Sequence, residues 1–438
     1  MIKRIFLTNI LYFISRYKFL SNIFSMFLIL IVNFYNVRLF IKKNSIKGLA
    51  LTHTRFRYDI DILNKSSELS IYKLPLKIQY LILIPFEKYL YEHKDKIFYP
   101  NDKLDKIKIS NQKYILKILN LFFGYFKFTL TASVSYVQDY DISKAAKKGG
   151  LKHIILMREN FGIVKKQADD ITNYYNAFEK STADLLIVHN QSTKRLFGNI
   201  KMFENSNIQA LGCIRMDEYL EKLKKVRVKD SKFSKNITFF SFSTNSGCHL
   251  AETPRIAAFE KKRGLVKFFK NTHNIVINFA KQNPSIQVNI KTKWSQNWID
   301  LIFKNWREYS GDSKFPINCN ITALDDPHEL IIKSDLVIGF NSTTLLEAGL
   351  RDVPIIIPKF DEASDIYNDY FDFEEYKGSF IVVNNPDEFN YLLSKSLSNP
   401  GISQEIKERR KILFQNYVSS LDGQTKGRYI EAIKKTIL

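Results

Sequence analysis

From Lys47 onward the sequence alternates short apolar runs with longer amphipathic stretches. The short runs are rich in β-branched and aromatic residues and have the length of buried strands, whereas the stretches between them have helical spacing. This alternation is typical of βα units arranged around a parallel sheet. It occurs in two series, which a charge-dense stretch at 221–235, poor in apolar residues, separates. The sequence therefore predicts an α/β protein with two parallel sheets.

We expect a division into an N-terminal helical segment at 1–46, a first α/β domain at 47–230 and a second at 231–438. The predicted strands lie at 48–52, 69–74, 128–136, 153–157 and 184–189 in the first domain, and at 237–242, 286–291, 317–321, 336–339 and 355–357 in the second. The main predicted helices lie at 76–92, 115–126 and 173–181, then at 273–282, 298–309, 327–334 and 343–350. The tail from 386 reads as helices with a break at 399–401.

The composition excludes several classes of protein. Of the 438 residues, 45% are hydrophobic and 25% are charged, which fits neither a disordered chain nor a polytopic membrane protein. The cysteines, Cys213, Cys248 and Cys319, lie far apart and form no CxxC pair. A disulfide framework and a zinc ribbon are therefore excluded, and a reducing compartment is expected.

Basic residues are concentrated at the N-terminus. The net charge is +22, and ten Lys and Arg residues precede the first acidic residue, Asp59. Residues 19–37, between Lys18 and Arg38, are uncharged and strongly apolar in part, and no small-residue cleavage site follows. A helix with basic flanks on both sides fits one that lies in the interface of an anionic leaflet, with a true span and a core-docked helix as alternatives. We therefore expect a cytoplasmic protein, peripheral on the inner face of the plasma membrane.

The stretch 333–358 carries the most informative motif. A buried strand ends at Gly339, a polar turn opens a helix, and a second strand follows. The polar turn consists of Asn341, Ser342, Thr343 and Thr344. Hydroxyls and the first N–H groups of a helix at this edge of a sheet can bind phosphate oxygens, and Glu347, one turn further on, can accept hydrogen bonds from ribose hydroxyls. The alternative is that Ser342 caps the helix and Glu347 is a solvated side chain.

This motif resembles the carboxyl-terminal half of GT-B glycosyltransferases, in particular bacterial surface-carbohydrate and capsule biosynthesis proteins and polyol-phosphate transferases. The resemblance implies two Rossmann-like domains facing a cleft, with the acceptor on the first and the nucleotide donor on the second. It implies that Ser342, Thr343, Thr344 and Glu347 hold the donor's diphosphate and ribose.

Weaker features support the resemblance. Gly212, Arg215 and Asp217 look like the family's Gly-x-x-Arg-x-Asp turn after the first domain. Lys291 and Lys293 stand where relatives carry a Lys at a strand end, a position that implies contact with donor phosphate. The segment 422–428, DGQTKGR, is similar to the family's closing Asp-Gly segment.

The sequence also departs from the family. The paired glutamate of many retaining enzymes is absent, because the residue eight positions before Glu347 is Gly339. The His-Pro pair of some CMP-sugar and CDP-polyol enzymes is missing too, since Lys293 is followed by Trp294. These departures leave the donor's base and sugar open.

Catalysis in this fold needs no metal in principle, because the dipole of a helix and basic side chains can stabilise the leaving nucleotide. We expect no metal site and no cofactor beyond the nucleotide-sugar substrate. Candidates for the base that deprotonates the acceptor are Asp59, Asp61 and Glu159. Each could instead be a surface carboxylate paired with a nearby arginine. His273, at the predicted start of a helix, is a candidate donor contact or else a cap or core residue.

The first hypothesis for the function is a glycosyltransferase that moves a sugar from a nucleotide donor to a surface glycan or lipid-linked acceptor, beside an anionic membrane. Alternatives of the same fold are a CDP-polyol phosphotransferase and a nucleotide-sugar 2-epimerase, of which the epimerase gives no reason for a membrane-binding helix. A catalytically dead scaffold is a further alternative. A nucleic-acid partner is not expected, because the sequence contains no helix-turn-helix, zinc finger, RRM or KH signature.

Overall fold

The computed structural model of the 438-residue chain describes most of both predicted domains. It covers residues 10–36, 45–51, 57–75, 110–134, 144–160, 168–176, 181–225, 233–244, 265–311, 314–365 and 378–438, except positions 12, 111, 159, 170, 173–174, 182, 205–206, 294–295 and 341. The helix predicted at 76–92 and the candidate residues Glu159 and Asn341 lie outside this coverage.

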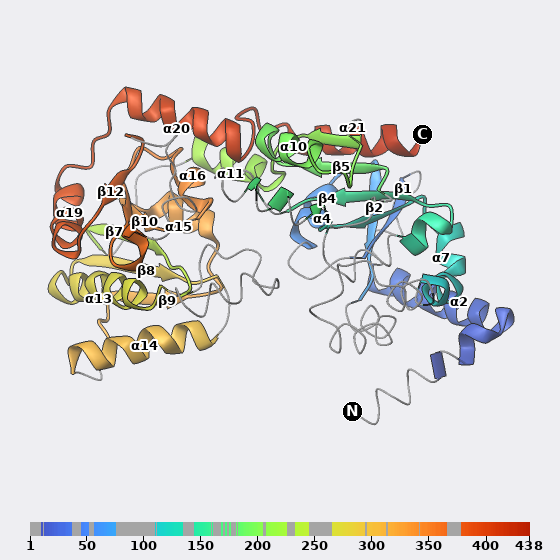
Figure 1. The fold of residues 1–438 in the computed structure, drawn as a ribbon, viewed down its shortest axis with the longest axis horizontal. Coiled ribbons are helices and arrows are strands. Elements are labelled where there is room, and N and C mark those ends of the chain that lie inside the picture. The colour runs from blue at the N-terminus through green and yellow to red at the C-terminus, as the bar shows by residue number, and fades with distance from the viewer. Residues whose placement is uncertain are drawn as a thin grey trace. The chain divides into compact units, whose positions relative to one another are not determined.

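The chain divides into two units (Figure 1). Unit 1 consists of Met1–Phe161, Asp170–Asp217 and Asp422–Leu438, and unit 2 consists of Gly162–Asp169 and Glu218–Leu421. The division differs from the expected boundary at 230/231. The main crossing comes earlier, the segment Gly162–Asp169 belongs to unit 2, and the last 17 residues return to unit 1.

Unit 1 is built on a fully parallel six-stranded sheet in the order β2-β1-β3-β4-β5-β6. Its strands are β1 (Ile46–Ala50), β2 (Leu69–Lys73), β3 (Phe128–Thr131), β4 (Lys152–Leu156), β5 (Leu185–Val188) and β6 (Ile208–Ala210). Most strand residues are buried, as expected for a parallel sheet covered by helices on both faces.

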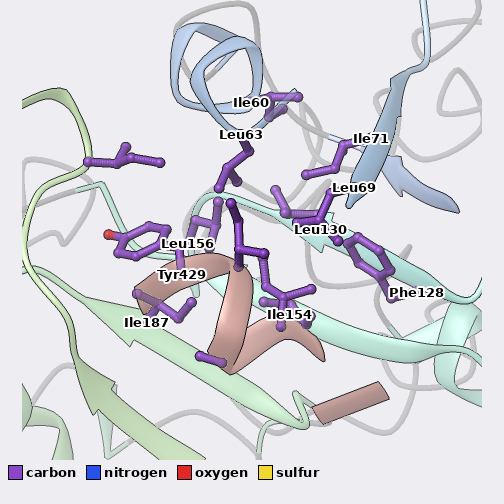
Figure 2. Close-up of a cluster of buried hydrophobic side chains, with 14 of the residues drawn as sticks. Ile60, Leu63, Leu69, Ile71, Phe128, Leu130, Ile154, Leu156, Ile187 and Tyr429 are labelled. Carbon is purple, nitrogen blue, oxygen red and sulfur yellow. The ribbon is translucent and has the colours of Figure 1, made fainter. Parts of the chain in front are cut away.

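One face of this sheet carries the core shown in Figure 2. Ile60 and Leu63 of helix α4 (Arg57–Leu63) pack there with strand residues such as Leu130 and Ile154. Tyr429 belongs to the same cluster and comes from the C-terminal helix α21 (Thr425–Ile437). The C-terminal helix therefore belongs with unit 1, and its assignment to the second domain is corrected, because its apolar face completes this core.

A second core in unit 1 joins helix α2 (Lys18–Tyr35) to helix α7 (Asn120–Tyr125) and to residues of β1 and β2. Leu28 and Val32 of α2 are buried there with Phe122 of α7. Two further helices are α10 (Gln191–Gly198) and α11 (Arg215–Lys224). The chain passes from unit 1 to unit 2 within α11, between Asp217 and Glu218.

Unit 2 contains a second fully parallel sheet in the order β12-β11-β10-β7-β8-β9. Its strands are β7 (Lys235–Phe240), β8 (Ile286–Lys291), β9 (Cys319–Thr322), β10 (Leu336–Gly339), β11 (Ile355–Pro358) and β12 (Ile381–Val383). Its helices are α13 (Val266–Gln282), α14 (Gln296–Ser310), α15 (Pro327–Lys333), α16 (Thr344–Ala348), α17 (Glu362–Asp365), α19 (Pro386–Ser398) and α20 (Gln404–Tyr417). The strand order reverses between β7 and β10, so this sheet is doubly wound with its switch point there.

The predicted α/β class and the two parallel sheets are confirmed. The ten predicted strands correspond to ten of those observed, and the bounds of β8 and β10 agree with the prediction. Strands β6 and β12 were not predicted. Helix α13 begins at Val266, well before the expected start at His273, because Phe268 and Phe269 are buried on its inner face.

Candidate functional site

The candidate site lies at the carboxyl end of β10, beside the switch point of the second sheet. In open doubly wound sheets, ligands bind outside the carboxyl ends of the strands where the strand order reverses. β10 ends at Gly339, and the polar turn and Glu347 follow it directly. A Cβ atom at Gly339 would lie 2.8 Å from Cδ2 of Leu345. The glycine thus permits α16 to approach the strand closely, which is a physical reason for the missing second glutamate.

Side-chain hydroxyls organise the turn after β10. Ser342 Oγ lies 2.5 Å from Thr344 Oγ1 and accepts a hydrogen bond of 3.3 Å from the Thr344 amide. The carbonyl of Thr343 accepts from the amides of Leu346 and Glu347 at 3.0 and 3.2 Å. Ser342, Thr343 and Thr344 are all partly buried. The structure thus brings the predicted hydroxyls together at the start of α16, which is shorter than the predicted helix at 343–350.

Glu347 is held by residues that the sequence did not single out. Its Oε2 lies 3.0 Å from Nε2 of His328, and both side chains are only 12–13% exposed. The ring of Tyr219 stacks on His328 with centroids 4.3 Å apart, and its hydroxyl donates to the Glu347 carbonyl oxygen at 2.9 Å. Burial, and then the nearby Glu347 charge, raises the pKa of Tyr219 well above its ordinary value, so the phenol remains a neutral donor.

Local sequence places His328 in this cluster. Asp326 caps α15, because its Oδ1 accepts from the amides of His328 and Glu329 at 2.8 and 3.1 Å. Pro327 occupies the first helical position, where its fixed φ suits the helix and its missing N–H is not needed. The cap after β9 thereby sets His328 in the first turn of α15. This Asp-Pro signature was the only sequence signal that could have pointed to His328.

Lys291 ends β8, where it was expected, and it joins the loops that follow two strands. Its Nζ donates to the carbonyl oxygens of Thr292 and Ala323 at 2.8 and 3.0 Å. Burial lowers the pKa of this ammonium, and the charges of Asp325 and Asp326 oppose that shift. Lys291 therefore shapes the carboxyl edge of β8 and β9. Lys293 is exposed beyond it.

His273 lies in the core of unit 2, so its expected role as a direct donor contact is corrected. The side chain has no exposed surface, and burial lowers its pKa to about 3. Its Nδ1 lies 2.6 Å from the Phe269 carbonyl oxygen and therefore carries the proton, which makes Nε2 the acceptor for Ser241 at 2.7 Å. Trp298 Nε1 donates to the same Ser241 oxygen at 3.0 Å. The neutral imidazole thus fixes Ser241, the residue that follows β7.

Two of the predicted base candidates, both in unit 1, have cationic partners. Asp59 lies in the first turn of α4, with its Oδ1 3.2 Å from Nε of Arg215. Asp61 forms an ion pair with Lys73. The predicted pairing of these carboxylates with cations is observed, although the partners are not the expected neighbouring arginines. A catalytic role for Asp59, Asp61 or Glu159 stays a prediction.

The Gly-x-x-Arg-x-Asp turn and the Asp-Gly segment meet in unit 1. Asp217 accepts hydrogen bonds from the amides of Thr425 and Lys426 at 3.1 and 2.7 Å, so it caps helix α21. Tyr429 donates to the carbonyl oxygen of Gly212 at 2.7 Å. These two motifs, about two hundred residues apart in sequence, therefore hold the C-terminal helix against unit 1.

Comparisons with known proteins agree with this architecture. No family model and no curated protein sequence matches the chain. Among solved structures, a UDP-N-acetylglucosamine 2-epimerase is similar with a TM-score of 0.51 and 14% identity, over 89% of this chain and 96% of that one. This similarity extends across both units and confirms the predicted GT-B fold, with two Rossmann-like domains.

Other solved structures are similar at lower scores. The wall teichoic acid polymerase TagF has a TM-score of 0.48 and 12% identity over 96% of this chain and 97% of that one. MurG from Acinetobacter baumannii has a TM-score of 0.43 and 10% identity over 89% of this chain and 99% of that one.

Proposed function

We propose that unit 2 binds a nucleotide-activated sugar and that the protein transfers this sugar to a surface glycan or lipid-linked acceptor at the cytoplasmic face of a membrane. The observation that carries the proposal is the position of Glu347 and the Ser342–Thr344 hydroxyls at the switch point of a doubly wound sheet. This edge is where such sheets bind nucleotides. The GT-B fold, shared with a UDP-N-acetylglucosamine 2-epimerase, supports the same ligand class.

The chemistry of the side chains suits the two ends of a nucleotide diphosphate. A carboxylate such as Glu347 accepts hydrogen bonds from ribose hydroxyls, and His328 holds it in one orientation. The hydroxyls of Ser342 and Thr344 can donate to phosphate oxygens as negative charge develops on the leaving group. In the proposed reaction the acceptor oxygen bonds to the anomeric carbon, the bond to phosphate breaks, and its electron pair leaves with the nucleotide.

The acceptor hydroxyl must lose a proton during transfer. Asp59, Asp61 and Glu159 remain our candidates for the carboxylate that takes it. Of the two described candidates, Asp59 is the more buried, and Arg215 lies beside it.

A second candidate function is 2-epimerisation of the nucleotide sugar. The similarity to the UDP-N-acetylglucosamine 2-epimerase, over 89% of this chain, favours it. An epimerase needs no acceptor and no membrane, however, so it leaves the basic apolar N-terminal segment without a role. We therefore place transfer first. A CDP-polyol phosphotransferase remains a third alternative.

The proposal is tested by thermal unfolding of the full chain with CMP, CDP, UDP, GDP and their sugar or glycerol conjugates. One nucleotide at a hundredfold excess over its Kd is expected to stabilise the fold by about 2.7 kcal/mol. This stabilisation should be lost in Glu347→Ala and retained in Glu405→Ala, which removes an exposed glutamate of α20. No response of the folded protein to any nucleotide would refute the proposal.

The selected donor then separates the two candidate activities. A transferase releases free nucleotide only when an acceptor is present. An epimerase inverts C2 of the sugar without any acceptor. Product analysis by mass spectrometry and NMR distinguishes the two outcomes.

A further inference from the structure

Helix α2 buries polar as well as apolar side chains against the rest of unit 1. The residues it buries, Ser21, Ser25, Leu28 and Val32, are spaced by four, three and four residues and form one stripe of the helix. Helix α2 contacts α7 and β2, and Figure 1 shows α2 beside α7. Two of the four buried residues are serines, although the helix as a whole is strongly apolar. The buried stripe of α2 is therefore more polar than the helix as a whole.

Hydrogen bonds join the polar side chains of α2 to the rest of unit 1. Ser25 Oγ contacts the Ile118 carbonyl and lies 3.0 Å from Oδ1 of Asn120, and Asn120 donates to Oδ1 of Asn22 at 2.5 Å. At the other end of the helix, Asn36 is buried and bonds to Lys73 in both directions, at 3.1 and 3.2 Å. Polar residues within the apolar segment therefore dock it together with Leu28 and Val32.

The opposite face of α2 is apolar and exposed. The side chains at this face are between 49% and 85% exposed: Phe19, Ile23, Met26, Phe27, Leu30 and Phe34. Their spacing of three, four or a single residue places them on one side of the helix. Contiguous apolar faces of this kind mark interaction surfaces, since water-facing helices do not carry them.

The charges around this face indicate its partner. Arg16 and Lys18, at the start of α2, are both exposed, and no acidic residue occurs in the sequence before Asp59. A second copy of the same face would bring like charges together. An anionic lipid leaflet instead offers hydrocarbon for the apolar side chains and negative headgroups for the basic ones.

We infer that the outer face of α2 inserts into an anionic leaflet with the helix parallel to the membrane plane, and that this helix does not cross the bilayer. Lys18–Tyr35 has 18 residues with a mean hydropathy of 1.6, so length and composition alone allow a span. Spanning would withdraw Ser25 and Asn36 from their protein partners and place them in hydrocarbon, where such groups are costly to bury. The inference specifies how the chain meets the membrane named in the proposed function, and it is tested without any nucleotide.

Flotation of the full chain with vesicles tests the inference without any donor. Vesicles of equimolar phosphatidylcholine and phosphatidylglycerol should bind the protein. Phe27→Asn combined with Leu30→Asn should weaken this binding at least about tenfold, because two large apolar side chains no longer enter the leaflet. Ile317→Asn, at a fully exposed isoleucine of unit 2, is the control and should bind like the native chain.

The charge component is measured separately. Arg16→Gln and Lys18→Gln should each weaken binding to the anionic vesicles by about fivefold and leave binding to pure phosphatidylcholine unchanged. Equal binding by the native chain and the Phe27→Asn, Leu30→Asn variant would overturn the inference. So would the absence of vesicle binding together with a dimer that the same variant dissociates.

Depth measurements decide between the two orientations. Spin labels at Phe19→Cys, Met26→Cys and Phe34→Cys should report equal depths for a helix in the membrane plane, once the signal of the native cysteines is subtracted. A helix that spans the bilayer would place the label at Met26→Cys deepest and the other two near opposite surfaces. That result would refute the in-plane orientation even if flotation succeeds.

Discussion

Each unit holds acidic side chains near the carboxyl ends of its parallel strands, but the partners of those side chains differ. In unit 1, Asp59 pairs with Arg215 and Asp61 pairs with Lys73. In unit 2, Glu347 receives its contact from His328, which is itself stacked on Tyr219. A permanent cation stabilises the charge of a carboxylate, whereas a histidine can orient it by a hydrogen bond without cancelling its charge. The arrangement in unit 2 is the one suited to a ligand rich in hydroxyls.

The two units are alike in another respect, since each buries a neutral histidine. His153 of β4 lies between the hydroxyls of Thr129 and Thr131, at 2.9 and 3.3 Å. His273 has Ser241 and a backbone carbonyl as partners. Burial lowers the pKa of each imidazole to about 3. Both units should therefore respond to acid through the same mechanism.

The largest predicted effect is the loss of stability in mild acid. Below the unfolded-state pKa of about 6.5, an unfolded histidine takes up a proton that the folded one refuses, so stability is complete above that pH and falls toward pH 3. The expected slope is about 1.4 kcal/mol per pH unit for each histidine. Urea unfolding at several pH values between 7 and 4 measures it. The lowered pKa of Asp184 adds a loss in the same direction below about pH 4.

Each unit can be followed separately in this experiment. All three tryptophans, Trp294, Trp298 and Trp306, lie in unit 2, so their fluorescence reports that unit, whereas circular dichroism reports both. His273→Gln should flatten the pH dependence of the fluorescence transition, and His153→Gln should change only the dichroism. A native chain whose unfolding midpoint is constant from pH 7 to pH 5 would contradict both buried-histidine assignments.

The parts of the fold that were predicted from the sequence are those with a local cause. Buried parallel strands are continuous apolar runs, so β8 and β10 were recognised with their observed bounds. The strands that were missed, β6 and β12, are three residues long and lie at the edges of their sheets, where a strand has one neighbour and a weak apolar signal. The position of His273 was misread because packing of Phe268 and Phe269, rather than a local signal, starts α13 earlier.

The distinction between local sequence signals and tertiary packing also explains which residues of the candidate site were predicted. The turn with Ser342 and the helix with Glu347 form one continuous segment, so the sequence alone predicted that they lie together. His328 and Tyr219 come from α15 and α11, and only the folded chain brings them to Glu347. The C-terminal helix was assigned to the wrong unit for the same reason, because its apolar residues meet their partners only in the core of unit 1.

An intermediate effect is expected when the two kinds of carboxylate are compared directly. Glu347→Gln should weaken nucleotide binding by about tenfold to a hundredfold, since hydrogen bonds to a charged group contribute about 1.5–3 kcal/mol. Asp59→Asn should leave nucleotide affinity unchanged and, if Asp59 is the base, reduce turnover. Calorimetry with the selected nucleotide measures affinity, and steady-state kinetics measures turnover. Equal losses of nucleotide affinity in both variants would remove the distinction between the units.

The smallest predicted effect concerns the helix that returns to unit 1. The start of α21 has no cap from its own neighbouring residue, and Asp217 supplies one from a distant part of the sequence. Asp217→Ala should therefore lower the free energy of unfolding by about 1 kcal/mol. Asp422→Ala, which removes an exposed partner of Arg428, should cost about half as much or less.

Urea unfolding followed by circular dichroism measures both changes, and tryptophan fluorescence should hardly respond, because α21 packs in unit 1 and the tryptophans lie in unit 2. Asp217→Asn should keep part of the stability, since its amide oxygen can still accept one of the two N–H bonds. If Asp422→Ala lowers the free energy of unfolding and Asp217→Ala does not, the local ion pair rather than the distant cap holds the start of α21. Asp217 would then have no structural role at this helix, and a role for Arg215 and Asp217 in ligand binding would become the better explanation of these two residues.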